Sequence, residues 1–516
     1  MSGRGLFPKV FQPLSVTVGH AMLELVTHML GLIARVALWA ALLAALGLLL
    51  AVLLTRVMVE LTLRRHASGV NSRRTLAFLH PYCNDGGGGE RVLWVALREI
   101  AARGLAPAPA WRLIVFTGGA ASPAQIRQHA FARFGISVSD RVEFVYLSLR
   151  PLIEPQYYRV GTLVFQALGS MALLLEALWR APPELLVDTT GFGFTYALAK
   201  FAGVRRIACY MHYPTITSDM IDRVARHAVS HNNAAYISRS PPLSALKLAY
   251  YRALRTLYRA SGRHADTVLA NSRWTAHHLS ALWGIPVVIV YPPCDTVALR
   301  AHPLALQQRR RRRRLVLSIG QFRPEKDHAL QLRAFAQLVR EWEAHGAAPP
   351  PPQLVLAGAV RHTADAARLK ALSALAFALG LEEPTRVCFA PNLSCAELHA
   401  LYAEASVGLH TMWNEHFGIG IVELMAAGAA PVAHASGGPA LDIVGTDARR
   451  GLLAETEGQY CQALAALTIE PGADARAMEI ALSARNFVAR RFSEDAFAAG
   501  FCEQMGALLA LLEESQ

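Results

Sequence analysis

The sequence has few charged residues and no recognisable cysteine motif. Charged residues make up 17% of the 516 residues, whereas 53% are hydrophobic. The seven cysteines are scattered, with no C-x-x-C pair, which argues against a disulfide framework and a zinc site and favours reduced thiols in a reducing compartment. Because a soluble enzyme rarely has so little charge, the composition points to a membrane segment.

One uncharged run is long enough to cross a membrane. Val36–Thr55 contains twenty residues without a charge and is flanked by Arg35 and Arg56, and about 20 apolar residues are what a helix needs to span the bilayer. A cleaved signal peptide is the alternative, although its apolar core is usually shorter. Arginines are more numerous after this run than before it, so we expect a single-pass anchor with the larger, C-terminal part in the cytosol.

Two other segments leave their interpretation open. Val160–Leu175 has sixteen uncharged residues, which is short for a span, so it is either a buried helix or a helix in the membrane interface near a lipid substrate. Arg309–Arg314 adds six consecutive arginines to a chain of net charge +13. No aromatic residues are interleaved with them, so a solvated linker is favoured over a nucleic-acid or phosphate site.

After residue 74, short apolar runs alternate with amphipathic helical stretches, and the pattern starts again at residue 315. This is typical of buried parallel strands in βαβ units, so we predict an α/β protein with two Rossmann-like, doubly wound domains facing a cleft. The predicted strands are Thr75–Leu79, Arg112–Phe116, Leu185–Asp188, Arg206–Met211, Leu315–Gly320, Gln353–Ala357, Arg386–Phe389 and Pro431–Ala433. The expected parts are an N-terminal segment with a basic linker (1–74), a first domain (75–300), an arginine-rich linker (301–314), a second domain (315–492) and a C-terminal helix crossing back (493–516).

Two strand ends in the first half carry candidate ligand-binding residues. A run of four glycines, Gly86–Gly89, follows the first strand and opens a predicted helix. Glycines allow close backbone approach, and a helix N-terminus offers free N–H groups to an anion, although the run could also be a flexible turn. His212 follows another strand in "YMHYPTIT" and is either a ligand contact or a core histidine.

The second half repeats this arrangement with cations. In "SIGQFRPEKDH", Arg323 and Lys326 lie just beyond the end of a strand. A guanidinium and an ammonium at that position can hold a diphosphate, and solvated surface charges are the alternative.

The stretch "NEHFGIGIVELMAAG" contains two glutamates, Glu415 and Glu423, with seven residues between them. A helix is expected to start at Gly418-Ile419-Gly420 and to stop at Gly428. Glu415 would then lie before the helix and could bind sugar hydroxyls, whereas Glu423 would lie on the helix and could bind a ribose diol. The free N–H groups between them suit a phosphate.

Together these stretches resemble the retaining glycosyltransferases of the GT-B fold that carry the E-x7-E motif, glycosyltransferase family four. Within that class, "FLHPYCNDGGGGERVLW", "MHYPTIT", "GQFRPEKDH" and "NEHFGIGIVELMAAG" are similar to the α-1,2-mannosyltransferases of asparagine-linked glycosylation, which extend the dolichol-linked oligosaccharide in the endoplasmic reticulum. The resemblance covers roughly residues 75–510. One position departs from the wider class, because Gln321 stands where an arginine often follows the strand-end glycine.

The resemblance implies a role for each motif residue. Glu415 would contact the mannose of GDP-mannose, Glu423 the ribose, and Arg323 and Lys326 the diphosphate. Gly87, Gly88 and Gly89 would lie against phosphates or acceptor, and His212 near the transferred sugar. Gly418, Ile419 and Gly420 would complete the donor site, with Glu415, His212 and Lys326 as the catalytic group.

The resulting expectation is a membrane-anchored mannosyltransferase of the endoplasmic reticulum that uses GDP-mannose and a dolichol-diphosphate oligosaccharide, with no metal and no nucleic acid. Other early mannosyltransferases of the pathway are expected as further partners. Two alternatives remain: a related transferase with another nucleotide-sugar or lipid-linked acceptor, and a non-catalytic membrane scaffold for partner transferases.

Overall fold

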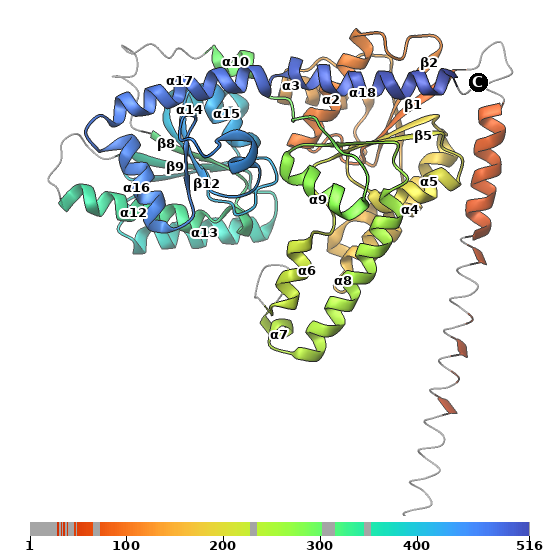
Figure 1. Cartoon of the computed structure of the whole chain (residues 1–516), viewed down its shortest axis with the longest axis horizontal. Coiled ribbons are helices and arrows are strands. Elements are labelled where there is room, and N and C mark those ends of the chain that lie inside the picture. The colour runs from red at the N-terminus through yellow and green to blue at the C-terminus, as the bar shows by residue number, and fades with distance from the viewer. Residues whose placement is uncertain are drawn as a thin grey trace, which may run out of the picture.

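The computed structural model describes residues 49–64, 73–227, 235–301, 315–344 and 352–514, together with single positions between 28 and 47. Residues 49–64 form a helix. Nine of the twenty residues of the predicted span Val36–Thr55, and all of Arg309–Arg314, lie outside the described residues. The described chain forms two α/β halves that lie side by side, and two C-terminal helices follow each other along one edge of the molecule, the first on the second half and the last on the first half (Figure 1).

The first half is built on a seven-stranded parallel sheet of order β3-β2-β1-β4-β5-β6-β7. Its strands are β1 (Arg74–Leu79), β2 (Trp111–Thr117), β3 (Val142–Tyr146), β4 (Leu185–Asp188), β5 (Arg206–Met211), β6 (Thr267–Ala270) and β7 (Val288–Ile289). Side chains of one strand alternate between two cores, so Leu76 and Phe78 pack on one face of the sheet and Ala77 and Leu79 on the other. This two-sided burial explains the continuous apolar runs in the sequence.

Helices cover both faces of this sheet. They are α2 (Gly88–Ala102), α3 (Pro123–Phe134), α4 (Thr162–Arg180), α5 (Tyr196–Phe201), α6 (Ser218–Ala225), α7 (Ala235–Ser238), α8 (Pro241–Gly262) and α9 (Arg273–Trp283). Apolar residues of α4, α5, α8 and α9 pack on one face, and those of α2 and α3 pack on the other. Helices α6, α7 and the start of α8 form a hairpin that projects from the body of the protein (Figure 1).

The second half contains a six-stranded parallel sheet of order β10-β9-β8-β11-β12-β13. Its strands are β8 (Leu315–Ile319), β9 (Gln353–Gly358), β10 (Val387–Pro391), β11 (Ala405–Leu409), β12 (Ala430–His434) and β13 (Leu452–Ala454). Its helices are α10 (Thr296–Arg300), α12 (His328–Ala344), α13 (Thr363–Ala378), α14 (Cys395–Glu404), α15 (Ile419–Ala427), α16 (Glu457–Thr468) and α17 (Ala473–Arg491). All eight strands predicted from the sequence are present, with ends that differ by at most two residues. The predicted domain limits stay a prediction.

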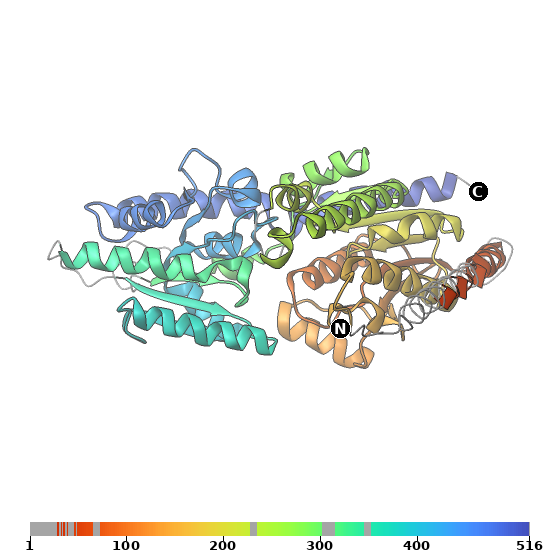
Figure 2. The ribbon, with the colours of Figure 1, turned by 90° about the horizontal axis from the view of Figure 1, so that it is seen from below.

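The C-terminal helix α18 (Glu494–Glu514) returns to the first half. The Ser493 hydroxyl accepts a hydrogen bond from the backbone N–H of Ala496 at 3.2 Å, as expected of an N-cap. Three side chains of α18 are buried with those of α2 in the core on one face of the first sheet: Phe497, Phe501 and Met505. Its apolar face is therefore a core face of the first half. In Figure 2, α18 runs along the first half toward the C-terminus, whereas α17 lies on the second half.

The helix at 49–64 packs against the side of the first half. Val59 is fully buried and lies beside Gly203, whose positive φ of 102° favours glycine. The indole N–H of Trp179 donates a hydrogen bond to the Thr55 hydroxyl at 2.6 Å, and Arg56 donates to the backbone oxygen of Phe201. The end of the predicted anchor is therefore held by the folded domain.

Among the described residues, two helices have the length and composition of a membrane span, α4 and α18. The sequence left two interpretations for the apolar run now found in α4. The second half of α4 buries Leu173, Leu174 and Leu178 in the core, whereas Phe165 and Leu168 in its first half are exposed. The helix is thus part of the domain core at one end and an apolar surface at the other.

Candidate functional site

A large cavity lies between the two halves, at the carboxyl ends of the strands of both sheets. Its volume is 2340 Å³, more than twice the upper end of the range usual for a site that holds one small molecule. Its lining comes from the residue that follows β5 and from the loops that follow β1, β8, β9 and β11. This is where open α/β sheets bind ligands, and the space is sufficient for two substrates.

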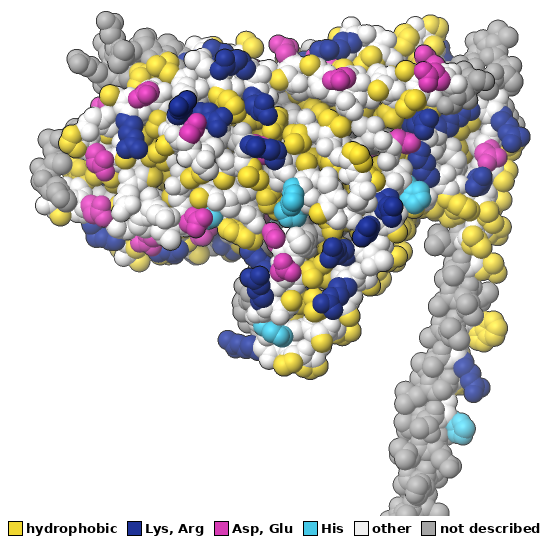
Figure 3. Space-filling view, in the orientation of Figure 1, with side chains coloured by type: hydrophobic (Ala, Val, Ile, Leu, Met, Phe, Trp, Pro, Cys, Tyr) yellow, Lys and Arg dark blue, Asp and Glu magenta, His cyan; other side chains and the backbone are white. Residues whose placement is uncertain are grey.

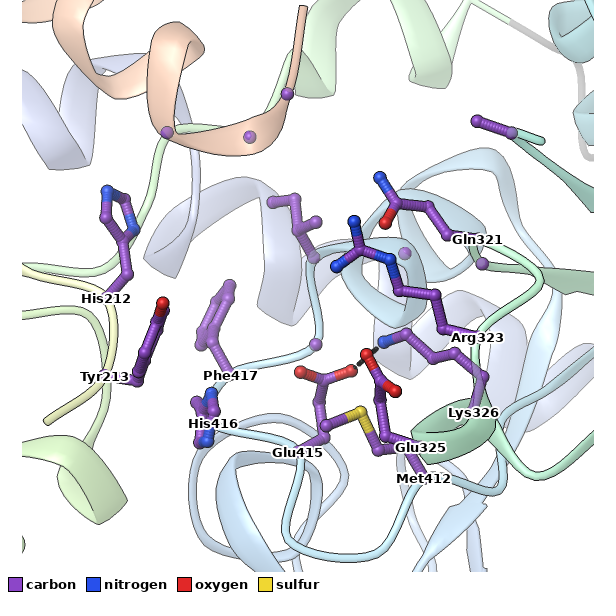
Figure 4. A pocket seen from close by; sticks show the side chains of 18 of the residues that line it. His212, Tyr213, Gln321, Arg323, Glu325, Lys326, Met412, Glu415, His416 and Phe417 are labelled. Atoms are coloured by element: carbon purple, nitrogen blue, oxygen red, sulfur yellow. Dashed lines mark hydrogen bonds and ion pairs between the residues drawn. The ribbon is translucent and has the colours of Figure 1, made fainter. Parts of the chain in front are cut away.

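Glu415 lines the cavity and makes two contacts with cationic or ionisable groups, of which Figure 4 shows the one with Lys326. Its Oε2 accepts a hydrogen bond from the ammonium of Lys326 and lies 3.1 Å from Nε2 of His410. Burial alone would raise the pKa of Glu415, but the hydrogen bond with His410 and the charge of Lys326 outweigh burial and hold this pKa well below its usual range. Glu415 is therefore a carboxylate at any physiological pH.

The helix predicted after Glu415 is α15, with Gly418 before its first residue and Gly428 after its last. Gly418 has a φ of 109°, a conformation that side chains rarely adopt. Its carbonyl accepts the N–H groups of Ile421 and Val422. Ile419 and Gly420 come before the first residues whose N–H groups bond within the helix. Both residues line the cavity, so their N–H groups are placed as an anion site requires.

Glu423 also lines the cavity, from the second turn of α15. Its Oε2 accepts a hydrogen bond from the hydroxyl of Tyr402 at 2.8 Å. Burial raises the pKa of Glu423, and the hydrogen bond from Tyr402 opposes that rise. Tyr402 lies on α14, so a second helix fixes the orientation of this carboxyl group.

The two predicted cations occupy the turn that follows β8. Arg323 and Lys326 both line the cavity, and in Figure 4 their side chains extend toward Glu415 from the same turn. Gln321 lies on the same side. The Thr411 hydroxyl donates to the backbone oxygen of Lys326 at 2.8 Å, which ties this turn to the loop after β11.

On the opposite side of the cavity, the glycine turn meets His212. Helix α2 begins at Gly88, and a Cβ at Gly89 would lie 3.3 Å from Nε2 of His212. This Nε2 is buried and has no hydrogen-bond partner among the described residues. Burial lowers the pKa of His212 to about 4, so the ring is neutral at physiological pH. Gly89 and His212 both line the cavity, so the start of α2 and the residue after β5 meet at this wall.

Aromatic side chains close the cavity between the two halves. His416, beside Glu415, stacks on Tyr213 of the first half with ring centres 5.4 Å apart, and its ring also lies 4.8 Å from that of Trp274. The Asn414 side-chain amide donates to Asp219 of the first half at 3.0 Å. The loop that carries Glu415 is thus held directly against the first half.

A second polar contact joins the halves farther from Glu415. Asp442 of the second half accepts hydrogen bonds from Arg273 of the first half at 2.8 and 3.0 Å.

Sequence reasoning missed several of these residues. His410 directly follows β11, as His212 directly follows β5, so the same strand-end signal applied. That strand was not predicted, because α14 runs into β11 without a loop. Tyr402 and Tyr213 carried no signal of this kind. Among the described residues, no group of three or more His, Cys, Asp and Glu side chains could hold a metal ion, and a metal-free reaction stays a prediction.

Solved structures with the same architecture include a glycosyltransferase from Rickettsia africae, with a TM-score of 0.56 at 14% identity over 85% of this chain and 99% of that one. HepE from Anabaena, solved with UDP and glucose, aligns with a TM-score of 0.57 at 17% identity over 84% of this chain and 100% of that one. Sucrose-phosphate synthase from Thermosynechococcus elongatus aligns with a TM-score of 0.60 at 17% identity over 86% of this chain and 100% of that one. The protein therefore has the GT-B fold that the motifs predicted.

In sequence, each half matches a known protein family. Residues 73–283 match the family described as ALG11 mannosyltransferase N-terminus, and residues 306–476 match the glycosyl transferases group 1 family. The Homo sapiens GDP-Man:Man(3)GlcNAc(2)-PP-Dol alpha-1,2-mannosyltransferase is 42% identical over 85% of this chain and 87% of that protein. The Dictyostelium discoideum protein of the same name is 41% identical over 76% of this chain and 77% of its own length. The chain belongs to the family of the GDP-Man:Man(3)GlcNAc(2)-PP-Dol alpha-1,2-mannosyltransferases.

Proposed function

We propose that this protein transfers mannose from GDP-mannose, in α-1,2 linkage and with retention of configuration, onto dolichol-diphosphate-linked Man(3)GlcNAc(2) and then Man(4)GlcNAc(2). The observation that carries the proposal is the group formed by Glu415, Lys326 and the open N-terminus of α15 in the cavity between the two halves. The names of the family members supply the donor and the acceptor.

Donor binding follows from the charges on the second half. Glu415 stays anionic, so it can accept hydrogen bonds from mannose hydroxyls. Arg323, Lys326 and the first N–H groups of α15 present positive charge where a diphosphate would lie. Glu423, oriented by Tyr402, is placed one turn farther along the helix and would accept from the ribose diol.

Catalysis would be mainly electrostatic. As the bond between mannose and diphosphate breaks, negative charge grows on the leaving oxygen, and Lys326, Arg323 and the helix N–H groups stabilise it. The leaving phosphate takes the proton of the acceptor hydroxyl on the same face of the sugar, which retains the configuration. His212 is neutral, so its Nε2 can form a hydrogen bond with a sugar hydroxyl without adding charge.

The location is proposed to be the membrane of the endoplasmic reticulum, with both halves on the cytosolic side. The anchor prediction for Val36–Thr55 and the dispersed cysteines support this orientation. The described cysteines are all free, and five of the seven, including Cys83 and Cys209, are buried, as expected of a protein in a reducing compartment.

The test is transfer by purified full-length enzyme in detergent, with GDP-mannose and a synthetic lipid-diphosphate Man(3)GlcNAc(2). We expect addition of one and then two mannoses, with α-1,2 linkage in the product. Stabilisation by uridine nucleotides but not by GDP would overturn the donor. Full rescue of cellular function by an inactive Glu415→Gln protein would support the scaffold alternative.

A further inference from the structure

We infer that the lipid-diphosphate end of the acceptor binds in a groove between the start of α4, α6 and α8. This inference rests on the proposed function and adds the place where the lipid is held. We call this surface the lipid groove and define it by its apolar residues Val160, Leu163, Met220, Leu243, Leu246 and Tyr250, all of which line the cavity described above.

The lipid groove is continuous with the donor site. One cavity extends from Glu415 and Lys326, past His212 and the α6 segment, to the start of α8. Its far end is apolar and open, since Val160 is 80% exposed and Leu246 69% exposed. A sugar would leave these side chains facing water, whereas an isoprenoid chain would cover them.

The groove has a defined shape because its three elements are joined. The backbone N–H of Val164 donates to the hydroxyl of Tyr250 at 3.3 Å, which connects the start of α4 to α8. The Thr217 hydroxyl caps α6 by accepting from the N–H of Met220 at 3.2 Å. Thr217 is the last residue of the "MHYPTIT" stretch, so the segment that carries His212 also sets the position of α6.

Three cationic side chains line the same part of the cavity: Arg159, Arg223 and Lys247. The Arg223 guanidinium lies 4.1 Å from the ring centre of Trp413, a residue of the second half, and the Lys247 ammonium lies 5.5 Å from that of Tyr251. One carboxylate, Asp219, is also present and accepts a hydrogen bond from the side-chain amide of Asn414 at 3.0 Å, so three positive charges stand against one negative charge. A diphosphate matches this surplus of positive charge, and it is the group that joins the lipid to the glycan.

The surroundings of the groove favour a membrane lipid over a peptide. In Figure 1 the α6–α8 hairpin projects in the direction in which the N-terminal end of the helix at residues 49–64 points. Leu49, Leu53 and Val57 on that helix are exposed. Figure 3 shows hydrophobic and basic side chains side by side on the hairpin. A lipid chain that leaves the groove would therefore leave on the side of the anchor.

The experiment measures binding of radiolabelled phytanyl diphosphate, an isoprenoid diphosphate without a glycan, to the full chain in detergent. Leu246→Gln is compared with Leu257→Gln, because both leucines are exposed on α8 at 69% and 60% but only Leu246 lines the cavity. Lys247→Gln is likewise compared with Arg252→Gln on the same helix. We expect Kd to rise about tenfold for Leu246→Gln and Lys247→Gln and to stay unchanged for both controls.

In transfer assays, the same two groove variants should raise KM for the lipid-linked acceptor and leave KM for GDP-mannose unchanged. Equal behaviour of the groove and control variants would overturn the inference, as would displacement of phytanyl diphosphate by GDP alone. So would a Leu246→Gln protein that loses only its binding to phospholipid vesicles, since the groove would then contact the bilayer. Binding needs no turnover, so a wild-type enzyme that binds phytanyl diphosphate without transferring mannose would contradict the proposed function and not the groove.

Discussion

The ammonium of Lys326 donates a hydrogen bond to Glu415, across 89 positions of sequence. The cation that follows β8 and the first glutamate of the E-x7-E motif therefore form one ion pair in the cavity. Because His410 contacts the same carboxylate oxygen, the negative charge of Glu415 is held in place before any substrate binds. A donor diphosphate would share Lys326 with Glu415.

Replacing Lys326 with methionine should reduce kcat by about 10²–10³-fold, the usual cost of losing one group that stabilises transition-state charge. The pKa of Glu415 should also rise, because burial would no longer be opposed by the nearby ammonium. Steady-state kinetics with GDP-mannose measures the first effect. Lys370→Met, an exposed lysine on α13, is the control, and an unchanged kcat for Lys326→Met would contradict the assigned role.

The hydroxyl of Tyr402 should act on donor binding through Glu423. Tyr402→Phe removes the 2.8 Å hydrogen bond that orients this carboxyl group, so we expect KM for GDP-mannose to rise several-fold with little change in kcat. Glu423→Gln should have a larger effect in the same direction. Calorimetric titration with GDP provides the measurement, and equal GDP affinity in wild type and both variants would exclude the ribose contact.

A side chain at position 89 should reduce the activity of the enzyme. A Cβ at this position would lie 3.3 Å from Nε2 of His212, closer than an ordinary contact, at a wall of the cavity. We expect Gly89→Ala to lose at least tenfold in kcat/KM while the melting temperature changes little. Gly458→Ala on α16, where a Cβ meets nothing within 4 Å, is the matched substitution. Equal activity of these two variants would place the substrate elsewhere.

Stability should decrease as the pH falls from about 6.5 toward 4, because His212 is buried in its neutral form. Burial lowers the pKa of His212 in the folded protein to about 4, below the ordinary histidine value of about 6.5. As the pH falls, the histidine of the unfolded chain therefore binds a proton before that of the folded chain. The free energy of unfolding decreases by about 1.4 kcal/mol for each unit of difference between the two pKa values, and this decrease is complete below the folded pKa. Melting temperatures between pH 7.5 and 4 should show a shallower decline for His212→Gln than for wild type. His264→Gln, at an exposed histidine, should follow wild type, and identical curves for all three proteins would contradict this account.

The parts of the fold that could be predicted were those with a strong local pattern. The strands found from sequence, such as Leu185–Asp188, are continuous apolar runs because both faces of each sheet are covered. Five strands were not named, and two of them lacked this signal: β7 has only two residues, and β11 follows α14 without a turn. The glycines around α15 predicted both of its ends, since a positive φ at Gly418 and Gly428 is a local property.

The residues of the candidate site also differ in whether a local pattern in the sequence indicates them. Residues at strand ends or helix starts, such as His212, Lys326 and Glu415, could be named from sequence because the chain direction alone brings strand ends to one edge of a sheet. His410 would have been found with β11. Tyr402 could not, because its contact with Glu423 depends on how α14 and α15 pack.

By itself, the sequence determined the class of the protein: two sets of parallel strands, glycine turns at their ends, an E-x7-E helix and the family to which these belong. Only the tertiary structure decided which groups meet. Lys326 pairs with Glu415, Tyr213 stacks on His416 from the other half, and Leu246 joins the donor cavity. The physical reason is that burial and strand order follow from short-range patterns, whereas hydrogen bonds and ring contacts depend on distances of a few ångströms between segments far apart in the chain.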